Sequence, residues 1–396
     1  MNYGVVAEFN PFHNGHKYLI DTLKSDGAST VTVVMSESFV QRGECAFFDV
    51  NARVKAAISC GADLVLSLPV NCAVASAEKF AFGGISTLNA LGVIDTVAFG
   101  SECCDASLLK KVAEIITSDE FSATLENRLS EGLSFPTARQ KALADIYGAD
   151  FAGVLRSPND ILGVEYIKAL NTLNSPCEVL AVKRTGASHD GAETAGDICS
   201  ASLIRTLDFE NAAHYVPECC RSIYTAEYSL NRAPVDMKKL GTAMLAKLRS
   251  MSVEDFAALP DVTEGLEHRI YSAVREARSI DEVLEKVKTK RYTHSRLRRI
   301  LLCAFLGIDK SSSAVAPPYI RVLGFNENGE KLLREAKGKA SLPIVTKSSQ
   351  VSALGGDAER VFALECFARD MFSLALPVPE VCGREMTDKL VVIKNS

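Results

Sequence analysis

The stretch Tyr3-Gly-Val-Val-Ala-Glu-Phe-Asn-Pro-Phe-His-Asn-Gly-His16 decides the fold of this 396-residue chain. Its apolar start predicts a strand, and Leu19, Ile20 and Leu23 follow with helical spacing, so a strand, a tight turn and a helix are expected in that order. A helix N-terminus offers free backbone N–H groups and partial positive charge, which suit phosphate. Two imidazoles one turn apart, beside a glycine that lets a ligand approach the backbone, add donors for the same oxygens. The pattern therefore predicts a nucleotide site that acts on the α-phosphate of a triphosphate.

Two other interpretations of His13 and His16 stay open at this point. A His-x-x-His pair can be half of a metal site, although no third ligand stands nearby in the sequence. The two side chains could also cap or pack the first helix without touching any ligand. The strand before the motif, the glycine within it and the helix after it favour the nucleotide site, and we assign no metal ligand.

The composition is that of an ordinary globular protein, with 47% hydrophobic and 23% charged residues. The length predicts two or three domains. The first residues carry no basic segment followed by a long apolar run, and no stretch approaches the roughly 18 uninterrupted apolar residues of a membrane span. We therefore expect no signal peptide, no membrane association and a cytoplasmic location.

Twelve cysteines are scattered along the chain, and none forms a Cys-x-x-Cys pair. Cys103-Cys104 and Cys219-Cys220 are adjacent pairs, which are poorly placed to bridge each other or to chelate one metal. Reduced thiols are expected, as in most cytoplasmic proteins.

The first two hundred residues alternate strand and helix patterns. Strands are expected over residues 4–7, 30–35, 64–68, 97–99 and 179–182, with helices over 50–59, 77–91 and 107–116 among the segments between them. This alternation predicts βαβ units and a parallel sheet, in which ligands bind beyond the carboxyl ends of the strands. The segments at those ends are residues 8–16, 36–43, 69–71, 100–102 and 183–190.

The rest of the chain changes character twice. Helical spacing fills residues 237–251, 265–277, 280–287 and 293–306, and residues 311–318 resemble a linker. Strands over 319–325 and 342–346 and a helix over 357–375 follow. The fold class expected is α/β: a Rossmann-like parallel-sheet domain over 1–225, a helical region over 226–310 and a small α+β region over 311–396.

A second motif, Ser200-Ala-Ser-Leu-Ile-Arg205, begins another helix after a glycine-containing loop. Serine hydroxyls there can cap the helix, and the same hydroxyls and amides can hold phosphate. Arg205 lies three residues past Ser202, on the same face. Capping alone explains this motif equally well in isolation, but together with the first motif it would bracket the polyphosphate of one nucleotide.

These motifs resemble the nucleotidyltransferase superfamily that includes class I aminoacyl-tRNA synthetases, and more closely the bacterial tRNA(Met) cytidine acetate ligase family. The matching elements run over most of the chain: Glu8-Phe-Asn-Pro-Phe-His-Asn-Gly-His16, Val34-Met-Ser36, Gln41-Arg-Gly-Glu44, Phe99-Gly-Ser-Glu102, Ser157-Pro-Asn-Asp-Ile-Leu-Gly163, Lys183-Arg-Thr-Gly186 with His189-Asp190, Lys290-Arg-Tyr-Thr293 and Tyr319-Ile-Arg-Val-Leu-Gly-Phe325. The late motif departs mildly, since Ser202 stands where threonine is common.

The resemblance implies an ATP site with His13 and His16 as the principal catalytic donors. Its other positions would be Val6, Ala7, Glu8, Phe9, Asn10, Pro11, Phe12, Asn14, Gly15, Lys17, Tyr18, Leu19, Gly100, Asn159 and Arg184, joined by Ser202 and Arg205 of the second motif. Gly100 would leave room for adenosine, Asn159 suits a base or ribose edge, and Arg184 could clamp phosphate. Taken singly, these three residues could instead be a turn glycine, a helix cap and a surface cation.

The resemblance also implies the reaction. ATP, which we expect to be accompanied by Mg²⁺, would activate acetate as acetyl-adenylate with release of pyrophosphate. The acetyl group would pass to N4 of the wobble cytidine, position 34, of elongator tRNA(Met). Two rivals stay open: a small-molecule adenylyltransferase that makes a nucleotide cofactor, and a nucleotide-binding regulator without turnover.

The partner of such an enzyme is an RNA, and one segment suits it. Although the chain carries a net charge of −5, residues 286–299 read KVKTKRYTHSRLRR, with seven Lys or Arg and no acid. Most charge runs are only solvated faces. Here we expect a tRNA-binding surface made by Lys290, Arg291, Tyr292, Arg296 and Arg299, with Tyr292 stacking on an unpaired base. Leu297, Ile300, Leu301 and Ala304 would pack inward on the same helix.

Overall fold

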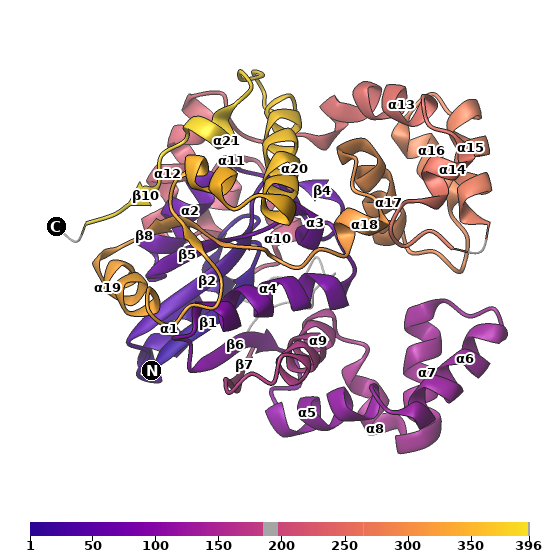
Figure 1. Cartoon of the computed structure of the whole chain (residues 1–396), viewed down its shortest axis with the longest axis horizontal. Coiled ribbons are helices and arrows are strands. Elements are labelled where there is room, and N and C mark those ends of the chain that lie inside the picture. The colour runs from indigo at the N-terminus through magenta and orange to yellow at the C-terminus, as the bar shows by residue number, and fades with distance from the viewer. Residues whose placement is uncertain (185–196, 264, 395–396) are drawn as a thin grey trace.

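The computed structural model describes residues 1–184, 197–263 and 265–394. A mainly parallel sheet forms its centre, and its strands lie in the order β10-β8-β5-β2-β1-β6-β7, with β9 paired to β8 (Figure 1). The strands are β1 (Asn2–Ala7), β2 (Thr30–Ser36), β5 (Leu64–Leu68), β6 (Thr96–Ser101), β7 (Glu178–Lys183), β8 (Ile320–Phe325), β9 (Ile344–Val345) and β10 (Val391–Val392). β1 pairs in parallel with both β2 and β6, so the first motif follows a central strand.

Helices cover both faces of this sheet because every central strand is buried on both sides. On one face, Leu88 of α4 (Ala77–Leu91) and Ile167 of α9 (Pro158–Thr172) share a core with Val6 and Val34. On the other face, Ile20 of α1 (Asn14–Ser25) and Val54 of α2 (Val50–Ser59) share a core with Val5, Val33 and Tyr224 of α12 (Glu218–Ser229). The five strands and three helices expected in this half are confirmed, and the ends differ by at most two residues.

A group of four helices is inserted between β6 and α9. It comprises α5 (Ala106–Ile115), α6 (Asp119–Ser130), α7 (Phe135–Tyr147) and α8 (Ala149–Val154), of which the sequence patterns predicted only the first. Figure 1 shows α6 and α7 extending away from the sheet, below the helical region.

The helical region packs around its own core. It contains η2 (Met237–Leu240), α13 (Gly241–Arg249), α14 (Val253–Ala257), α15 (Leu266–Glu276), α16 (Ile280–Val287) and α17 (His294–Leu306). The single helix expected over 237–251 is therefore a 3-10 turn followed by a helix, and α14 was not predicted. Leu297, Ile300, Leu301 and Ala304 face this core, as predicted from their spacing.

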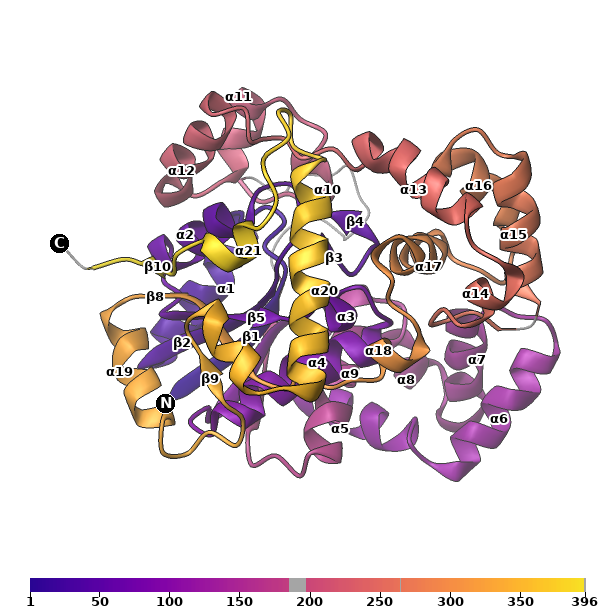
Figure 2. The same ribbon diagram turned by 45° about the horizontal axis from the view of Figure 1, so that its top comes forward.

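The C-terminal segment is joined closely to the N-terminal sheet. β8 runs antiparallel to β5, and Gly324 lies opposite Val65. α20 (Gly356–Ser373) crosses the molecule next to α3 (Val70–Ala73), and its Phe372 enters the core of the helical region (Figure 2). Residues 310–313, in and next to the expected linker, form the short helix α18 (Lys310–Ser313). The boundaries at 225/226 and 310/311 stay predictions, and the structure adds that residues 311–396 contribute strands to the sheet of the first segment.

The cysteines contradict one expectation. Cys60 and Cys219 form a disulfide, whereas the sequence was expected to hold only reduced thiols. The two residues are 159 positions apart, and only the packing of α2 against α12 brings them together. Within the described ranges, no helix has both the length and the apolar character needed to cross a membrane.

Candidate active site

A cavity opens at the carboxyl ends of β1, β6 and β7. Of the nineteen site residues predicted from the sequence, fifteen line this cavity: Val6, Ala7, Glu8, Phe9, Asn10, His13, Gly15, His16, Tyr18, Leu19, Gly100, Asn159, Arg184, Ser202 and Arg205. The first motif thus meets the second motif and the ends of β6 and β7 in one place. This is the position that a parallel sheet gives to a nucleotide.

His13 and His16 lie over one another at the start of α1, with ring centroids 3.8 Å apart. The Nδ1 atom of His13 accepts a hydrogen bond from the backbone N–H of Gly15 at 3.0 Å, so His13 caps the helix. The Nδ1 atom of His16 accepts from the backbone N–H of His13 at 3.3 Å. Because both Nδ1 atoms are acceptors, each neutral ring carries its proton on Nε2. The capping role and the ligand-donor role are therefore compatible, since they use different nitrogens.

Both imidazoles are neutral at physiological pH. Burial, with repulsion from Arg184 and Arg205, lowers the pKa of His13 to about 3. Burial also holds the pKa of His16 well below its usual value, with His13 and Arg184 as further causes. Two neutral N–H donors can stabilise negative charge that develops on a phosphate without having to lose a proton.

These pKa shifts predict a stability that falls in mild acid. Below pH 6.5 the unfolded chain protonates both imidazoles while the folded chain does not, so stability present above pH 6.5 is lost as the pH falls toward about 3. His13→Gln should remove about 1 kcal/mol per pH unit of this slope between pH 5 and 6. Urea unfolding at several pH values measures it, and equal slopes for the variant and the parent protein would contradict the neutral assignment of His13.

The glycine of the first motif is required by the histidine two residues before it. A Cβ atom at position 15 would lie 2.9 Å from Cε1 and 3.1 Å from Nδ1 of His13. Any larger residue would therefore displace the ring whose Nδ1 caps α1. The Gly15 position thus fixes the His13 ring as well as leaving the backbone open to a ligand.

Four residues of the predicted ATP set do not line the cavity: Pro11, Phe12, Asn14 and Lys17. Phe12 is fully buried, and its backbone N–H donates to the hydroxyl of Tyr224 at 3.0 Å. The amide of Asn14 donates to the carbonyl oxygens of Asp197 at 2.7 Å and His214 at 3.3 Å. Phe12 and Asn14 therefore hold the loop in place, and a direct contact of these four residues with ATP stays a prediction.

The far side of the cavity is organised by a buried carboxylate that the sequence reasoning did not single out. Asp160 accepts hydrogen bonds from the Ser101 hydroxyl at 2.5 Å and from the backbone N–H groups of Glu102 and Cys103. This fixes the end of β6 next to the first turn of α9. Asn159 then donates to Glu102 at 2.6 Å, and the carboxylate of Glu102 lies 3.6 Å from Arg184.

The side chain of Arg184 lies against Gly100, the residue predicted to leave room for adenosine. A Cβ atom at position 100 would lie 3.1 Å from Cγ of the Arg184 side chain. Gly100 therefore leaves room for Arg184 in this structure, and its contact with adenosine stays a prediction. The motif residues after Arg184, including Gly186, His189 and Asp190, lie outside the described residues.

Arg184→Ala should weaken ATP binding about tenfold, because one charge-assisted contact to phosphate contributes roughly 1.5 kcal/mol. The side chain is about one-third exposed and its ion pair with Glu102 is long, at 3.6 Å, so the fold should survive. Calorimetric titration with ATP checks this prediction. A dissociation constant for ATP equal to that of the parent protein would show that Arg184 is only a surface cation.

Arg53 was also missed by the sequence reasoning, although it supports the whole loop. Its buried guanidinium donates to the carbonyl oxygens of Glu8 at 2.7 Å, Ser36 at 2.9 Å and Phe48 at 3.1 Å. It thereby ties the end of β1 to the end of β2. A single arginine inside a helical pattern gives no sequence signal of this role.

The basic segment is only partly available to an RNA. Lys290 and Arg291 are exposed, as expected. Tyr292 is only 8% exposed, and the guanidinium of Arg296 lies 5.1 Å from its ring centroid. The expectation that Tyr292 stacks on an unpaired base is therefore wrong for this conformation, because its ring packs into the helical core.

Arg296 and Arg299 are also committed to partners within the protein. Arg296 donates to the carbonyl oxygen of Asp261 at 2.7 Å, and Arg299, which is largely buried, lies 3.8 Å from the carboxylate of Asp261. The exposed cation on this helix is Arg298, which the sequence reasoning left out. A contact of Arg296 or Arg299 with RNA stays a prediction.

α17 reaches the rim of the cavity through the hairpin of β3 (Phe39–Val40) and β4 (Glu44–Cys45). Gly43 has φ of +76°, and a Cβ atom there would lie 2.7 Å from the backbone nitrogen of Arg299, so only glycine permits this approach. Glu44 forms an ion pair with Arg298 on one side and lies 3.8 Å from Arg205 on the other. The basic helix and the second motif therefore share one carboxylate (Figure 2 shows α17 beside β3 and β4).

The parallel sheet and the paired histidines at a helix start define a class of protein. The family model described as HIGH Nucleotidyl Transferase matches residues 1–387, so the chain is a nucleotidyltransferase of this class. Proteins described as tRNA(Met) cytidine acetate ligase from Thermoanaerobacter sp. (strain X514) and Caldanaerobacter subterraneus subsp. tengcongensis are 36% and 38% identical to it. The matches cover 98% and 94% of this chain and the same shares of those proteins. The chain belongs to the tRNA(Met) cytidine acetate ligase family.

Solved structures agree with this assignment. The apo form of Thermotoga maritima TmcAL superposes with a TM-score of 0.95 at 34% identity, and the form bound with alpha-thio ATP with a TM-score of 0.92 at 33% identity. Each covers 100% of both chains. The α/β fold class predicted from the sequence and the family resemblance are both confirmed.

Proposed function

We propose that this protein uses ATP to activate acetate and transfers the acetyl group to N4 of the wobble cytidine, position 34, of elongator tRNA(Met). The observation that carries the proposal is the pair of neutral His13 and His16 rings in the cavity, each with its Nδ1 atom used and its Nε2–H left to donate. Family membership supplies acetate and tRNA(Met) as the substrates that fit the names of the relatives. The Thermotoga maritima relative is described with alpha-thio ATP, which supports ATP as the nucleotide.

In the first step, a carboxylate oxygen of acetate attacks the α-phosphorus of ATP, and the bond to the β,γ-pyrophosphate breaks. His13 and His16 donate to the α-phosphate oxygens, where negative charge develops in the transition state. Arg184 and Arg205 line the same cavity and provide positive charge for the polyphosphate. In the second step, the cytidine N4 amine attacks the acetyl carbonyl carbon, the bond from that carbon to the phosphate oxygen breaks so that AMP leaves, and the proton lost by N4 passes to solvent.

We also propose that Mg²⁺ enters with ATP and is held mainly by phosphate oxygens and water, the coordination that this ion prefers with nucleotides. Bound in this way, it would neutralise charge on the leaving pyrophosphate. Both acidic residues named among the described lining of the cavity are already engaged, since Glu8 accepts from the backbone of Gln41 at 2.6 Å and Glu44 pairs with Arg298. Burial raises the pKa of Glu8, which further disfavours it as a metal ligand.

The tRNA would approach over the basic segment. Lys290, Arg291 and Arg298 are exposed, and the Glu44 link connects the last of them to Arg205 in the cavity. A backbone held by these cations would bring an unpaired cytidine toward the site where acetyl-adenylate forms. The cytidine itself would be recognised by groups of the cavity, because Tyr292 is buried.

Exchange of labelled pyrophosphate into ATP tests the first step without tRNA. We expect exchange that depends on acetate and that falls when acetate is replaced by a bulkier carboxylate. The rival small-molecule adenylyltransferase would exchange pyrophosphate independently of acetate. A nucleotide-binding regulator would bind ATP and exchange none.

A further inference from the structure

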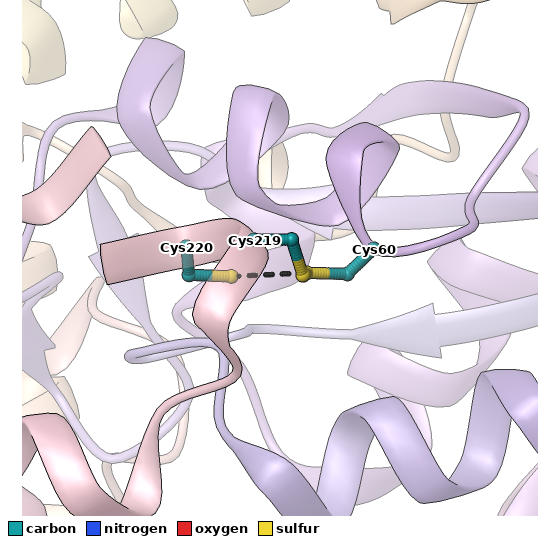
Figure 3. Close-up of side chains that lie close together, drawn as sticks. All are labelled: Cys60, Cys219 and Cys220. Carbon is teal, nitrogen blue, oxygen red and sulfur yellow. Dashed lines mark hydrogen bonds between the residues drawn. A yellow bond between two sulfur atoms is a disulfide. The ribbon is translucent and has the colours of Figure 1, made fainter. Parts of the chain in front are cut away.

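Three cysteine sulfurs lie together beneath the candidate active site. Cys60 and Cys219 form a disulfide, and the Sγ atom of Cys220 lies 3.1 Å from the Sγ atom of Cys60 (Figure 3). Cys60 and Cys220 are buried, while Cys219 is partly exposed. The Sγ atom of Cys220 is therefore close enough to attack the disulfide, and the sulfur that it approaches is that of the buried Cys60.

The disulfide joins the two helices that support the first motif from below. Cys60 is the C-cap of α2, and Cys219 and Cys220 lie in the first turn of α12. One helical turn further on, Tyr224 accepts the hydrogen bond from the backbone N–H of Phe12, and its ring stacks on Phe48 with centroids 4.1 Å apart. A shift of α12 would therefore move Phe12, the residue that precedes His13.

The segment that leads into α12 supports the same loop at further points. Arg205 donates to the carbonyl oxygen of Asn10 at 2.9 Å, and the carbonyl oxygens of Asp197 and His214 accept from Asn14. Residues 197–228 therefore hold the loop through Asn10, Phe12 and Asn14. The Cys60–Cys219 bond adds a covalent cross-link between this segment and α2, besides the main chain itself.

We propose that the three cysteines form a thiol–disulfide switch that sets the affinity of the active site for ATP. In the oxidised form, the disulfide holds α12 on α2 and Tyr224 under Phe12. A dithiol reductant supplies two electrons and two protons, the Cys60–Cys219 bond breaks, and α12 is held by non-covalent packing alone. The ATP readout rests on the proposed function, whereas the disulfide chemistry does not.

Cys220 allows a second disulfide pairing, in which Cys60 is bonded to Cys220 instead of Cys219. Its thiolate can attack the Sγ atom of Cys60, so that a Cys60–Cys220 bond forms and Cys219 leaves as a thiolate that takes up the proton lost by Cys220. No external oxidant is consumed in this exchange. Burial raises the pKa of the Cys220 thiol to about 12, so the exchange is slow at neutral pH and faster in alkali.

A thiolate metal site is the competing use of the same three sulfurs. Structural zinc sites take four ligands, and among the described residues only these three cysteines form the group. A bound Zn²⁺ also requires all three sulfurs as separate thiolates, which the Cys60–Cys219 bond excludes. The observations therefore favour the disulfide, and metal binding is an outcome that the experiment must separate.

The first experiment maps the bonds in the purified full-length protein by non-reducing peptide mass spectrometry. The parent protein and Cys220→Ser should contain the Cys60–Cys219 bridge, Cys219→Ser should form a Cys60–Cys220 bridge on oxidation, and Cys60→Ser should form neither. Exposed Cys382→Ser is the matched control and should leave the Cys60–Cys219 bridge intact. Three free thiols after oxidation, or one tightly bound Zn²⁺ that Cys60→Ser loses, would overturn the proposal.

The second experiment titrates ATP into the oxidised and the reduced protein. Reduction should weaken ATP binding by roughly fivefold or more, the lower range of coupling between linked sites. Cys60→Ser should bind like the reduced protein in both conditions, and reoxidation should restore the parent protein. Tyr224→Phe, which removes the acceptor of the Phe12 N–H, should abolish the redox response while leaving the bridge intact. Equal ATP affinity of the bridged and reduced parent protein would overturn the switch, and absence of ATP binding in both forms would overturn the proposed function instead.

Discussion

His16→Ala should lower the rate of acetyl-adenylate formation by about 10²- to 10³-fold, the cost of removing one preorganised donor to a developing charge. His16 lines the cavity, and because its Nδ1 atom accepts from the His13 backbone, the Nε2–H is the donor that it can offer to a phosphate oxygen. Acetate-dependent pyrophosphate exchange measures the loss. His16→Gln, which keeps an N–H donor, should retain more activity than His16→Ala.

The fold should survive this substitution because His16 is a partly exposed residue of the first helical turn. His268→Ala provides the control, since His268 is a largely exposed histidine on α15, outside the cavity lining. Its exchange rate should equal that of the parent protein. A His16→Ala protein with near-parental exchange would show that the first motif is not the centre of adenylation.

Lys290→Ala combined with Arg291→Ala should weaken tRNA binding about 10- to 100-fold at low salt and leave ATP binding unchanged. Each lost phosphate contact also reduces the slope of log affinity against log salt by about 0.7 to 0.9, so the double variant should flatten it by about 1.4 to 1.8. Filter binding at several salt concentrations gives both values. Arg296 and Arg299, which the sequence also suggested, are excluded because their contacts with Asp261 would make a loss of binding ambiguous.

A matched double variant tests whether the effect is local. Lys331 and Arg334 are exposed cations on α19 (Glu327–Ala336), far from the basic segment in Figure 1. Replacing both with alanine removes the same net charge and should leave the tRNA affinity close to the parental value. Equal weakening by both double variants would indicate a general charge effect, and no weakening by Lys290→Ala/Arg291→Ala would show that the RNA binds elsewhere.

Much of the architecture could be predicted because strands and helices carry their periodicity locally. The strand of residues 4–7 and the helix of 77–91 follow from such local patterns, and the meeting of His13 with Ser202 was predicted by combining two motifs that each lie at a helix start. The pairing of β8 with β5 could not be predicted, because a strand pattern does not say which sheet edge it joins. The Cys60–Cys219 bridge was missed for the same reason, since it depends on how two distant helices pack.

The site residues could be predicted where they lie within one motif and contact one another. The residues that support the motif from distant parts of the chain could not. His13, Gly15 and His16 interact with one another through bonds of two or three residues' separation. Arg53, Asp160 and Tyr224 act from other elements, and each is an ordinary member of its helix pattern. Tyr292 misled the interpretation because a basic neighbourhood suggests exposure, whereas the helical core buries its ring.

In the proposed reaction, one site makes acetyl-adenylate and passes its acetyl group to tRNA(Met). The most direct test incubates the purified protein with ATP, isotopically labelled acetate and elongator tRNA(Met), followed by nucleoside mass spectrometry of the digested tRNA. We expect labelled N4-acetylcytidine at position 34, formed with one pyrophosphate released for each acetyl group transferred. Pyrophosphate release that is independent of acetate, or acetate-dependent release without any label in cytidine, would contradict it.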